Sequence, residues 1–137
     1  MSKSFLELTN EEKNEILPVV VNMLKHRKNP SKVFSNTEIR EVLLNFDLSV
    51  TDAQIRKIVF YIRNNNLIPL LLANTYGYYV GTRIEDVRNW ITMQEGKINA
   101  MNQTLTSIRE QLDKKRTELL NGESENFGGQ ITIFDFE

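Results

Sequence analysis

The chain has no cysteine, one histidine, one tryptophan and three prolines among its 137 residues. The absence of cysteine excludes disulfides, thiolate metal ligands and a thiol nucleophile. The single histidine, His26, stands beside lysine and arginine without an acidic neighbour, and no P-loop, GxGxxG or HExxH pattern occurs. We therefore expect no enzymatic activity, no catalytic residue, no cofactor and no bound metal ion.

Long apolar runs are also missing. No stretch approaches the roughly 20 apolar residues that a membrane span requires. The N-terminal residues have no apolar core of the kind found in signal peptides. These features predict a cytoplasmic protein that has no membrane partner.

Charge is nearly balanced overall, at −1, but unevenly distributed. Residues 17–83 contain nine Lys and Arg against four Asp and Glu, whereas residues 84–137 contain six against ten. Such asymmetry favours contact between the basic part and nucleic acid. A chance distribution is the alternative.

Four capping boxes, each a Ser or Thr followed three residues later by Glu or Gln, begin at Thr9, Ser35, Thr51 and Thr82. They predict helices from Thr9 to about Lys25, from Ser35 to about Phe46, over 52–64, and onward from Thr82. Pro18 should kink or restart the first helix, because proline lacks an N–H group. The residues predicted to face inward are Ile16, Val20, Met23 and Leu24, then Ile39, Val42, Leu43 and Phe46, then Ile55, Ile58, Val59 and Ile62.

A β-hairpin is predicted to follow the third helix. Asn64, Asn65 and Asn66 should end that helix, since asparagine tolerates a left-handed conformation. A strand is expected over 67–73, starting after Pro69 or lying at an edge. Gly77 permits the tight turn over 74–77, and alternation in the return strand places Tyr78 and Val80 on one face and Tyr79 on the other. The fold class is therefore mainly α with a small β-hairpin, a winged helix-turn-helix over 9–82.

Residues 83–121 carry the clearest pattern in the chain. Apolar residues recur with alternating spacings of three and four, interrupted only by Gln94 and Lys115, which predicts a coiled-coil dimerisation helix. At about 37 residues this helix would be about 55 Å long, so we expect a homodimer or a higher oligomer. Parallel and antiparallel pairing remain open, as does packing of the helix on its own domain. The dimerisation residues are Ile84, Val87, Ile91, Ile98, Met101, Leu105, Ile108, Leu112 and Leu119.

The helix should end at Asn121-Gly122, leaving 122–137 as a flexible linker and an interaction tail.

Duplex DNA is the partner that this arrangement suggests, because Arg, Lys, Gln and Asn side chains on a helix in the major groove can bind base edges. Solvent-side candidates on the third helix are Gln54, Arg56, Lys57, Tyr61, Arg63 and Asn64. The hairpin turn adds Asn74, Thr75 and Tyr76, and the basic loop adds Arg27, Lys28 and Lys32 as phosphate contacts. The alternatives are a domain used for protein contacts, and a loop that is only a solvated connector.

Residues 55–80, IRKIVFYIRNNNLIPLLLANTYGYYV, resemble the third helix and wing of small winged-helix proteins encoded by phages and prophages. The resemblance covers about residues 15–85. It implies a DNA-binding or replication-associated role inside a bacterial host. The chain departs from the family at Thr75-Tyr76, where small or basic residues are more usual.

The C-terminal residues Gln130-Ile131-Thr132-Ile133-Phe134 resemble the pentapeptide that binds the bacterial sliding clamp, with Ile133 in place of leucine. The resemblance implies that Gln130 occupies a polar subsite and that Ile133 and Phe134 fill an apolar pocket, with Phe136 beyond them. A tail that packs on the coiled coil or adds as a β-strand is the alternative.

Together these observations predict a dimeric winged-helix DNA-binding protein that acts in DNA replication or transcription regulation. An interaction adaptor, which binds a host or phage replication protein through the winged helix or the tail, is the alternative function.

Overall fold

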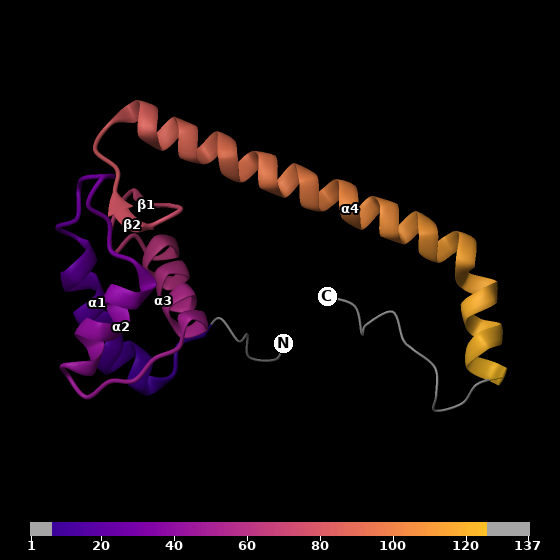
Figure 1. Ribbon diagram of the computed structural model, residues 1–137, viewed down its shortest axis with the longest axis horizontal. Coiled ribbons are helices and arrows are strands. Elements are labelled where there is room, and N and C mark those ends of the chain that lie inside the picture. Colours follow the sequence, from indigo (N-terminus) through magenta and orange to yellow (C-terminus); the bar gives the residue numbers. More distant parts are fainter. Residues whose placement is uncertain (1–6, 126–137) are drawn as a thin grey trace. The chain divides into compact units, whose positions relative to one another are not determined.

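The computed structural model describes residues 7–125 (Figure 1). The protein is mainly helical, with one two-stranded antiparallel sheet and a long C-terminal helix, as the sequence predicts. Residues up to Thr92 form one compact unit, and residues from Met93 onward form another. The elements in chain order are η1 (Glu12–Ile16), α1 (Leu17–Leu24), α2 (Asn36–Leu44), α3 (Asp52–Asn64), β1 (Leu71–Asn74), β2 (Gly77–Val80) and α4 (Ile84–Glu125).

Three of the predicted capping boxes are formed. The hydroxyls of Thr9, Ser35 and Thr51 each accept a hydrogen bond, at 3.1 Å, from the backbone N–H three residues later. The Glu or Gln at that later position accepts from the backbone N–H of the cap in return. These reciprocal bonds satisfy donors that have no partner inside the helix, so the sequence fixes where each helix starts.

At Pro18, where a kink or a restart was predicted, the first helix changes from π-helical to α-helical turns. Element η1, which precedes Pro18, is a π-helix, whose turns are wider than those of an α-helix. An α-helix begins at Leu17, with the proline in its first turn. A proline ring crowds the carbonyl of the preceding turn and offers no N–H, and a widened turn relieves both constraints.

The core of the first unit lies between α1, α2 and α3 (Figure 1). Its fully buried side chains recur at the predicted helical spacing. Phe46 was expected inside, but it is 58% exposed. Helix α2 ends at Leu44 and Asp47 takes a positive φ of 59°, so the helical period stops before Phe46, and Leu48 is buried instead. The most deeply buried apolar residues are Ile16, Val20, Leu24, Ile39, Leu43, Ile55, Ile58, Val59 and Ile62.

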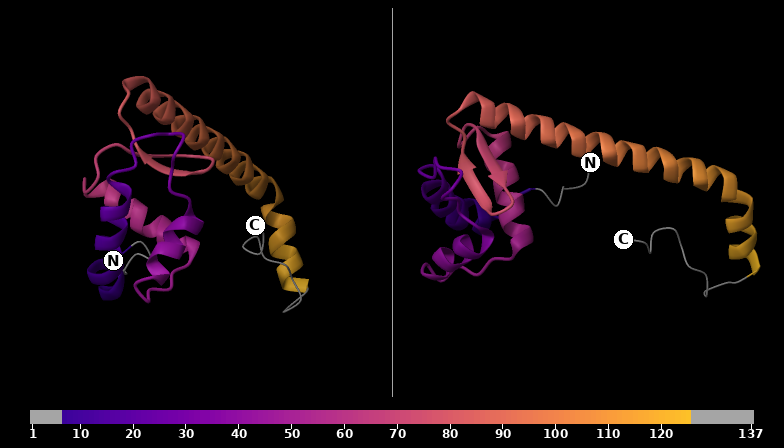
Figure 2. Two further views of the ribbon diagram at one scale, coloured as in Figure 1. Left: turned by 60° about the vertical axis from the view of Figure 1, so that its left-hand side comes forward. Right: turned by 45° about the horizontal axis from the view of Figure 1, so that its top comes forward.

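The hairpin begins after Pro69, as predicted, and Asn66 adopts the left-handed conformation expected at the end of α3 (φ 55°). The two strands lie side by side in both views of Figure 2, and they pair Leu72 with Tyr79 and Ala73 with Tyr78. Phe34 adds a third chain segment to this sheet, because it exchanges backbone hydrogen bonds of 3.0 and 2.8 Å with Tyr78.

Both faces of the hairpin are buried. Tyr78 belongs to the helical core, and Val80 packs against that core. On the opposite face, Leu72 and Tyr79 are buried too, and a Cβ added at Gly81 would touch both Leu72 and Val87 of α4. The first turns of α4 therefore cover the outer face of the hairpin, a contact that strand alternation alone does not predict.

Helix α4 differs from the prediction at both ends. The Arg83 carbonyl accepts the first helical bond, from Val87, and within residues 7–125 no hydrogen bond joins Thr82 to Glu85, so the fourth capping box is not formed. The helix also continues through Asn121-Gly122 to Glu125. A glycine inside an established helix costs about 1 kcal/mol, which weakens the helix without ending it.

We predict that Gly77→Ala destabilises the first unit by about 3 kcal/mol, because the backbone at Gly77 has φ +157° and an added Cβ would overlap the Phe34 carbonyl group. The free energy of unfolding, measured with urea, tests this. Gly96→Ala is the matched control: its Cβ has no neighbour within 4 Å, and alanine should stabilise α4. Equal stability of wild type and Gly77→Ala would show that the Phe34–Tyr78 contact is not required.

Candidate nucleic-acid interface

Two of the DNA-contact candidates on α3 are held by a carboxylate of the first helix. The Gln54 side-chain amide donates to Glu12 Oε2 at 3.1 Å, while its oxygen accepts from the Thr51 backbone at 2.9 Å. Lys57 Nζ lies 2.6 Å from Glu12 Oε1, and only 17% of the Lys57 side chain is exposed. The expectation that Gln54 and Lys57 point to solvent is therefore corrected, because both bind within the domain.

Glu12 itself is 2% exposed, which makes it the one buried charged residue within the described chain. Burial acts to raise the pKa of its carboxyl group. Hydrogen bonds from Lys57, from the Thr9 backbone and from Gln54, together with the positive charge of Lys57, outweigh burial and lower the pKa. Glu12 therefore stays ionised and links the start of the first helix to α3.

Arg63 anchors the other end of α3. Its Nε donates to the Leu71 carbonyl at 2.8 Å, and its guanidinium lies over the Trp90 ring, 5.1 Å from the centroid. Burial lowers the pKa of Arg63, and the nearby Tyr78 partly opposes that shift. Arg63, also expected on the solvent side, instead connects α3 to β1 and to the first turns of α4.

The exposed side of α3 therefore carries fewer polar candidates than expected. Arg56 and Asn64 are exposed, although the Asn64 amide donates to the Phe60 carbonyl at 2.8 Å. Tyr61 is half-buried and packs against the core. Phe60, four residues from both Arg56 and Asn64, is 45% exposed. Helical spacing could have placed Phe60 on this face, but only polar residues were considered as candidates.

The basic loop is attached to the hairpin. The Asn74 side-chain amide donates to the Pro30 carbonyl at 3.0 Å, and the Val80 N–H donates to the Arg27 carbonyl at 2.6 Å. The Arg27 guanidinium lies 3.8 Å from the centroid of the Phe34 ring. Lys28 and Lys32 are exposed, and neither forms an ion pair within residues 7–125. The predicted phosphate contacts therefore belong to a loop that is bonded to both ends of the hairpin.

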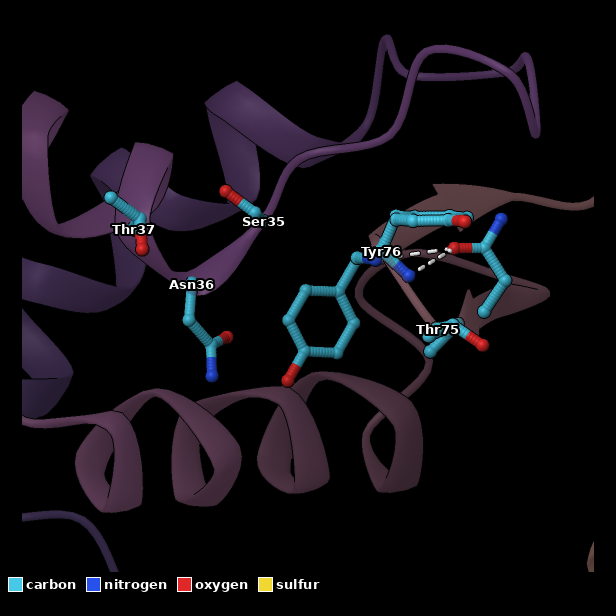
Figure 3. A pocket seen from close by; sticks show the side chains of 9 residues that line it. Ser35, Asn36, Thr37, Thr75 and Tyr76 are labelled. Atoms are coloured by element: carbon cyan, nitrogen blue, oxygen red, sulfur yellow. Dashed lines mark hydrogen bonds between the residues drawn. The ribbon is translucent and has the colours of Figure 1, made fainter.

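A hollow of about 310 Å³ lies between the start of α2 and the hairpin turn. Figure 3 shows Ser35, Asn36 and Thr37 on one side of it and Thr75 and Tyr76 on the other. The Asn74 side-chain oxygen shapes the turn by accepting from the N–H groups of Tyr76 and Gly77. The residues from α2 were missed in the sequence, because only the tertiary fold brings them to the hairpin.

The hollow combines exposed and unsatisfied polar groups. The Asn36 side-chain oxygen is buried without a hydrogen-bond partner among the described residues. Burial raises the pKa of Tyr78, which lines the hollow, while the nearby charges of Arg63 and Arg56 act to lower it. The polar groups that line the hollow suit a hydrogen-bonding ligand.

Within residues 7–125, no three acidic or histidine side chains gather closely enough to hold a metal ion. In that range, no helix combines the length and apolar character needed to cross a bilayer.

We predict that Lys57→Met destabilises the protein by about 3 kcal/mol at pH 7, because it leaves the buried Glu12 carboxylate without its cation. The free energy of unfolding from urea titrations measures the effect, and the exposed Lys25→Met is the control, expected within about 0.5 kcal/mol of wild type.

This deficit should depend on pH. The lowered pKa of Glu12 means that the pair contributes stability above the ordinary glutamate value of 4.5 and loses it as pH falls through the folded-state pKa. The deficit of Lys57→Met should therefore hold from pH 7 down to about 4.5 and shrink as the pH falls further, through the folded-state pKa. A deficit that does not shrink below pH 4.5 would contradict an ionised Glu12.

Comparison of the chain with protein-family models, with curated proteins and with solved structures finds no match.

Proposed function

We propose that the protein is a dimeric winged-helix DNA-binding protein in which α3, the loop over 26–32 and the hairpin turn contact the duplex. The observation that carries this proposal is the attachment of the loop to the hairpin by the Asn74–Pro30 and Val80–Arg27 hydrogen bonds. The first bond holds Pro30 at the turn and the second holds Arg27 at the other end of β2, so the loop with the exposed Lys28 and Lys32 runs along the hairpin. A dimer would present this set of cations twice, and cations that neutralise phosphates dominate affinity for DNA.

The order of the elements supports a winged helix. A helix, a bridge at Phe34, two further helices and a hairpin follow one another, and the bridge residue pairs with the second hairpin strand. Helices α2 and α3 are joined by a short turn and contact one another. In such a domain α3 is the helix that enters the major groove, and the hairpin turn touches the backbone or the minor groove.

The exposed residues divide the work of contact between them. Arg56 can donate two hydrogen bonds to a guanine edge and is our candidate for reading sequence, with Asn64 beside it. Lys28 and Lys32 would bind phosphates and fix the position of the protein. Thr75 and Tyr76, at the turn, would touch the sugar-phosphate backbone. Gln54, Lys57 and Arg63 would act indirectly, by holding α3 in place.

The proposed setting comes from the sequence resemblances. A phage or prophage origin, a role in replication or transcription regulation, and a bacterial cytoplasm follow from residues 55–80. Binding of the sliding clamp follows from the tail, whose Gln130, Ile133, Phe134 and Phe136 lie outside the described residues. A titration of purified clamp with the peptide 130–137, and with a variant carrying Ala at Phe134, tests the tail separately from the DNA-binding domain.

An interaction adaptor is the second candidate, and Phe60 is the observation that favours it. An aromatic ring with 45% exposure at the centre of the outer face of α3 suits a protein contact, since aromatic residues are enriched at interfaces. In this reading, Phe60→Ala abolishes capture of a protein partner, and Arg56→Ala leaves that capture unchanged.

We predict that Arg56→Ala weakens binding to a preferred duplex by about 1–3 kcal/mol, because it removes the exposed cation of α3. Fluorescence anisotropy with labelled duplex measures the dissociation constant. Arg109→Ala, on α4 and outside the candidate surface, is the charge-matched control and should bind as wild type does.

Lys28→Ala and Lys32→Ala should each weaken binding by the same factor for every DNA sequence. Each should also reduce the slope of log K against log salt concentration by about one per chain. Anisotropy at a series of salt concentrations measures this slope. Binding that is absent at low salt, or a slope that neither substitution changes, would count against DNA as the ligand of this surface.

A further inference from the structure

Helix α4 presents an exposed apolar face from Ile98 onward. Ile98 is 56% exposed and Leu105 47%, and the other apolar residues of this face between them and the end of the helix are exposed or half-buried. A continuous exposed apolar face of this length marks an interaction surface. Its seven-residue period suits another helix of the same period.

Charges flank this face in a specific pattern. The seven positions of the repeat are lettered a to g, with Ile91, Ile98 and Leu105 at a. Glu95 and Arg116 then occupy e positions, and Lys97 and Glu118 occupy g positions. All four are exposed. They stand near the two ends of the face, with acidic and basic residues in opposite order on the two flanks. Residues at e and g determine which helices pair and in which direction.

From this pattern we propose that α4 pairs with a second copy of itself in an antiparallel coiled coil, in the register that places Leu105 opposite the partner's Ile108. Reversing one helix sets e beside e and g beside g. In this register Glu95 meets the partner's Arg116, and Lys97 meets the partner's Glu118. The two-fold axis repeats each pair, so every charge among these four residues has an opposite neighbour. Apolar layers of Met101 with Leu112 and of Leu105 with Ile108 fill the centre.

A parallel, in-register pair is disfavoured by the same residues. It would stack Lys115 on the partner's Lys115 and Gln94 on the partner's Gln94 inside the seam. Its flanking g and e residues would meet as Lys97 with Asn102, Thr104 with Arg109 and Gln111 with Arg116. None of these pairs joins opposite charges, and the stacked lysines repel one another.

The neighbouring antiparallel registers are less favourable. A shift of one heptad in one direction sets Arg88 against the partner's Arg116, which offsets the attraction between Glu95 and the partner's Arg109 that the shift also creates. A shift in the other direction sets Arg109 against the partner's Arg109. The proposed register instead places Arg109 beside the partner's Asn102 and leaves Arg88 outside the paired region. Like charges in contact suppress the wrong pairing, which gives the helix one favoured register.

The conformation of Lys115 suits this role. Its ammonium group lies 3.3 Å from Glu118 of the same chain, so its charge sits at the edge of the apolar face rather than within it. In the proposed register the aliphatic stem of Lys115 would cover the partner's Ile98, and its charge would join the Lys97–Glu118 pair.

The first turns of α4 are not needed for pairing. Val87 and Trp90 are half-buried in the chain's own first unit, where Arg63 lies over the Trp90 ring and Gly81 separates Val87 from Leu72. The paired region therefore starts near Ile91, where the contacts with the domain end. This inference rests on the self-association in the proposed function and adds its direction and register.

Cysteine cross-linking tests the register directly, because the chain has no cysteine of its own. Ile98→Cys and Lys115→Cys are prepared separately in the full chain, and sedimentation confirms the mass of each. The two are then mixed, oxidised mildly and run on a non-reducing gel. Facing residues of adjacent helices lie within reach of a disulfide, so we expect a covalent dimer from the mixture and none from either variant alone.

A charge exchange provides the second test. Arg116→Glu should weaken self-association roughly tenfold, and adding Glu95→Arg should restore it, because the register sets these residues side by side. Arg109→Glu is the matched control and should change association little, since its predicted neighbour is Asn102.

Ile98→Cys that cross-links to itself would overturn the antiparallel proposal in favour of a parallel pair. A protein that sediments as a dimer but forms no cross-link, whether the two variants are mixed or oxidised alone, would overturn the register. A chain that sediments as a monomer would overturn self-association altogether. Loss of DNA binding leaves cross-linking unaffected, so failure of the proposed DNA-binding function and failure of this inference can be told apart.

Discussion

The buried carboxylate of Glu12 is the constraint on which the arrangement of the helices depends. It binds Lys57 and Gln54 of α3 while capping the helix that contains it. A buried charge is costly unless it is paired, so α3 cannot rotate about its axis without leaving Glu12 unsatisfied. At the other end of α3, the Arg63–Leu71 hydrogen bond opposes rotation as well. The two anchors together determine which side chains of α3 face solvent.

The orientation of α3 determines which of its side chains could contact DNA in the proposed function. Because three polar residues of α3 are used internally, Arg56 is its principal exposed cation, and the remaining positive charge comes from Lys28 and Lys32 in a separate loop. The hairpin supports this loop, and its burial on both faces holds it firmly. Specific contact would therefore depend on a few side chains placed by rigid elements, while affinity would depend on charge contributed by the loop and multiplied by a second copy of the chain.

The sequence predicts well those features that depend on neighbouring residues. Capping at Thr9, Ser35 and Thr51, the effect of Pro18 and the left-handed Asn66 each follow from interactions over a few positions. Helical periodicity likewise identifies most of the core. It fails at Phe46, because the helix ends two residues earlier. The predicted helix end at Asn121-Gly122 is also wrong, because a glycine inside an established helix costs only about 1 kcal/mol.

The candidate site was harder to predict, because its geometry depends on contacts distant in sequence. Polar residues on a predicted helix were assumed to face solvent, whereas Gln54 and Lys57 meet a carboxylate more than forty positions earlier. Capping boxes offered one clue, since Glu12 and Gln54 both serve as the returning side chain of a box, but only the fold brings the two boxes together. Asn36 and Thr37 reach the hairpin turn for the same reason.

Chemical-shift mapping by NMR tests the central claim most directly, that the surface formed by Arg56, the loop over 26–32 and the hairpin turn binds duplex DNA. Titration of the ¹⁵N-labelled full chain with a duplex should shift the amide resonances of residues 26–37, 53–60 and 74–78. The amides of 98–119, on α4, should remain unchanged. Shifts confined to α4, or no shifts at low salt, would contradict the account.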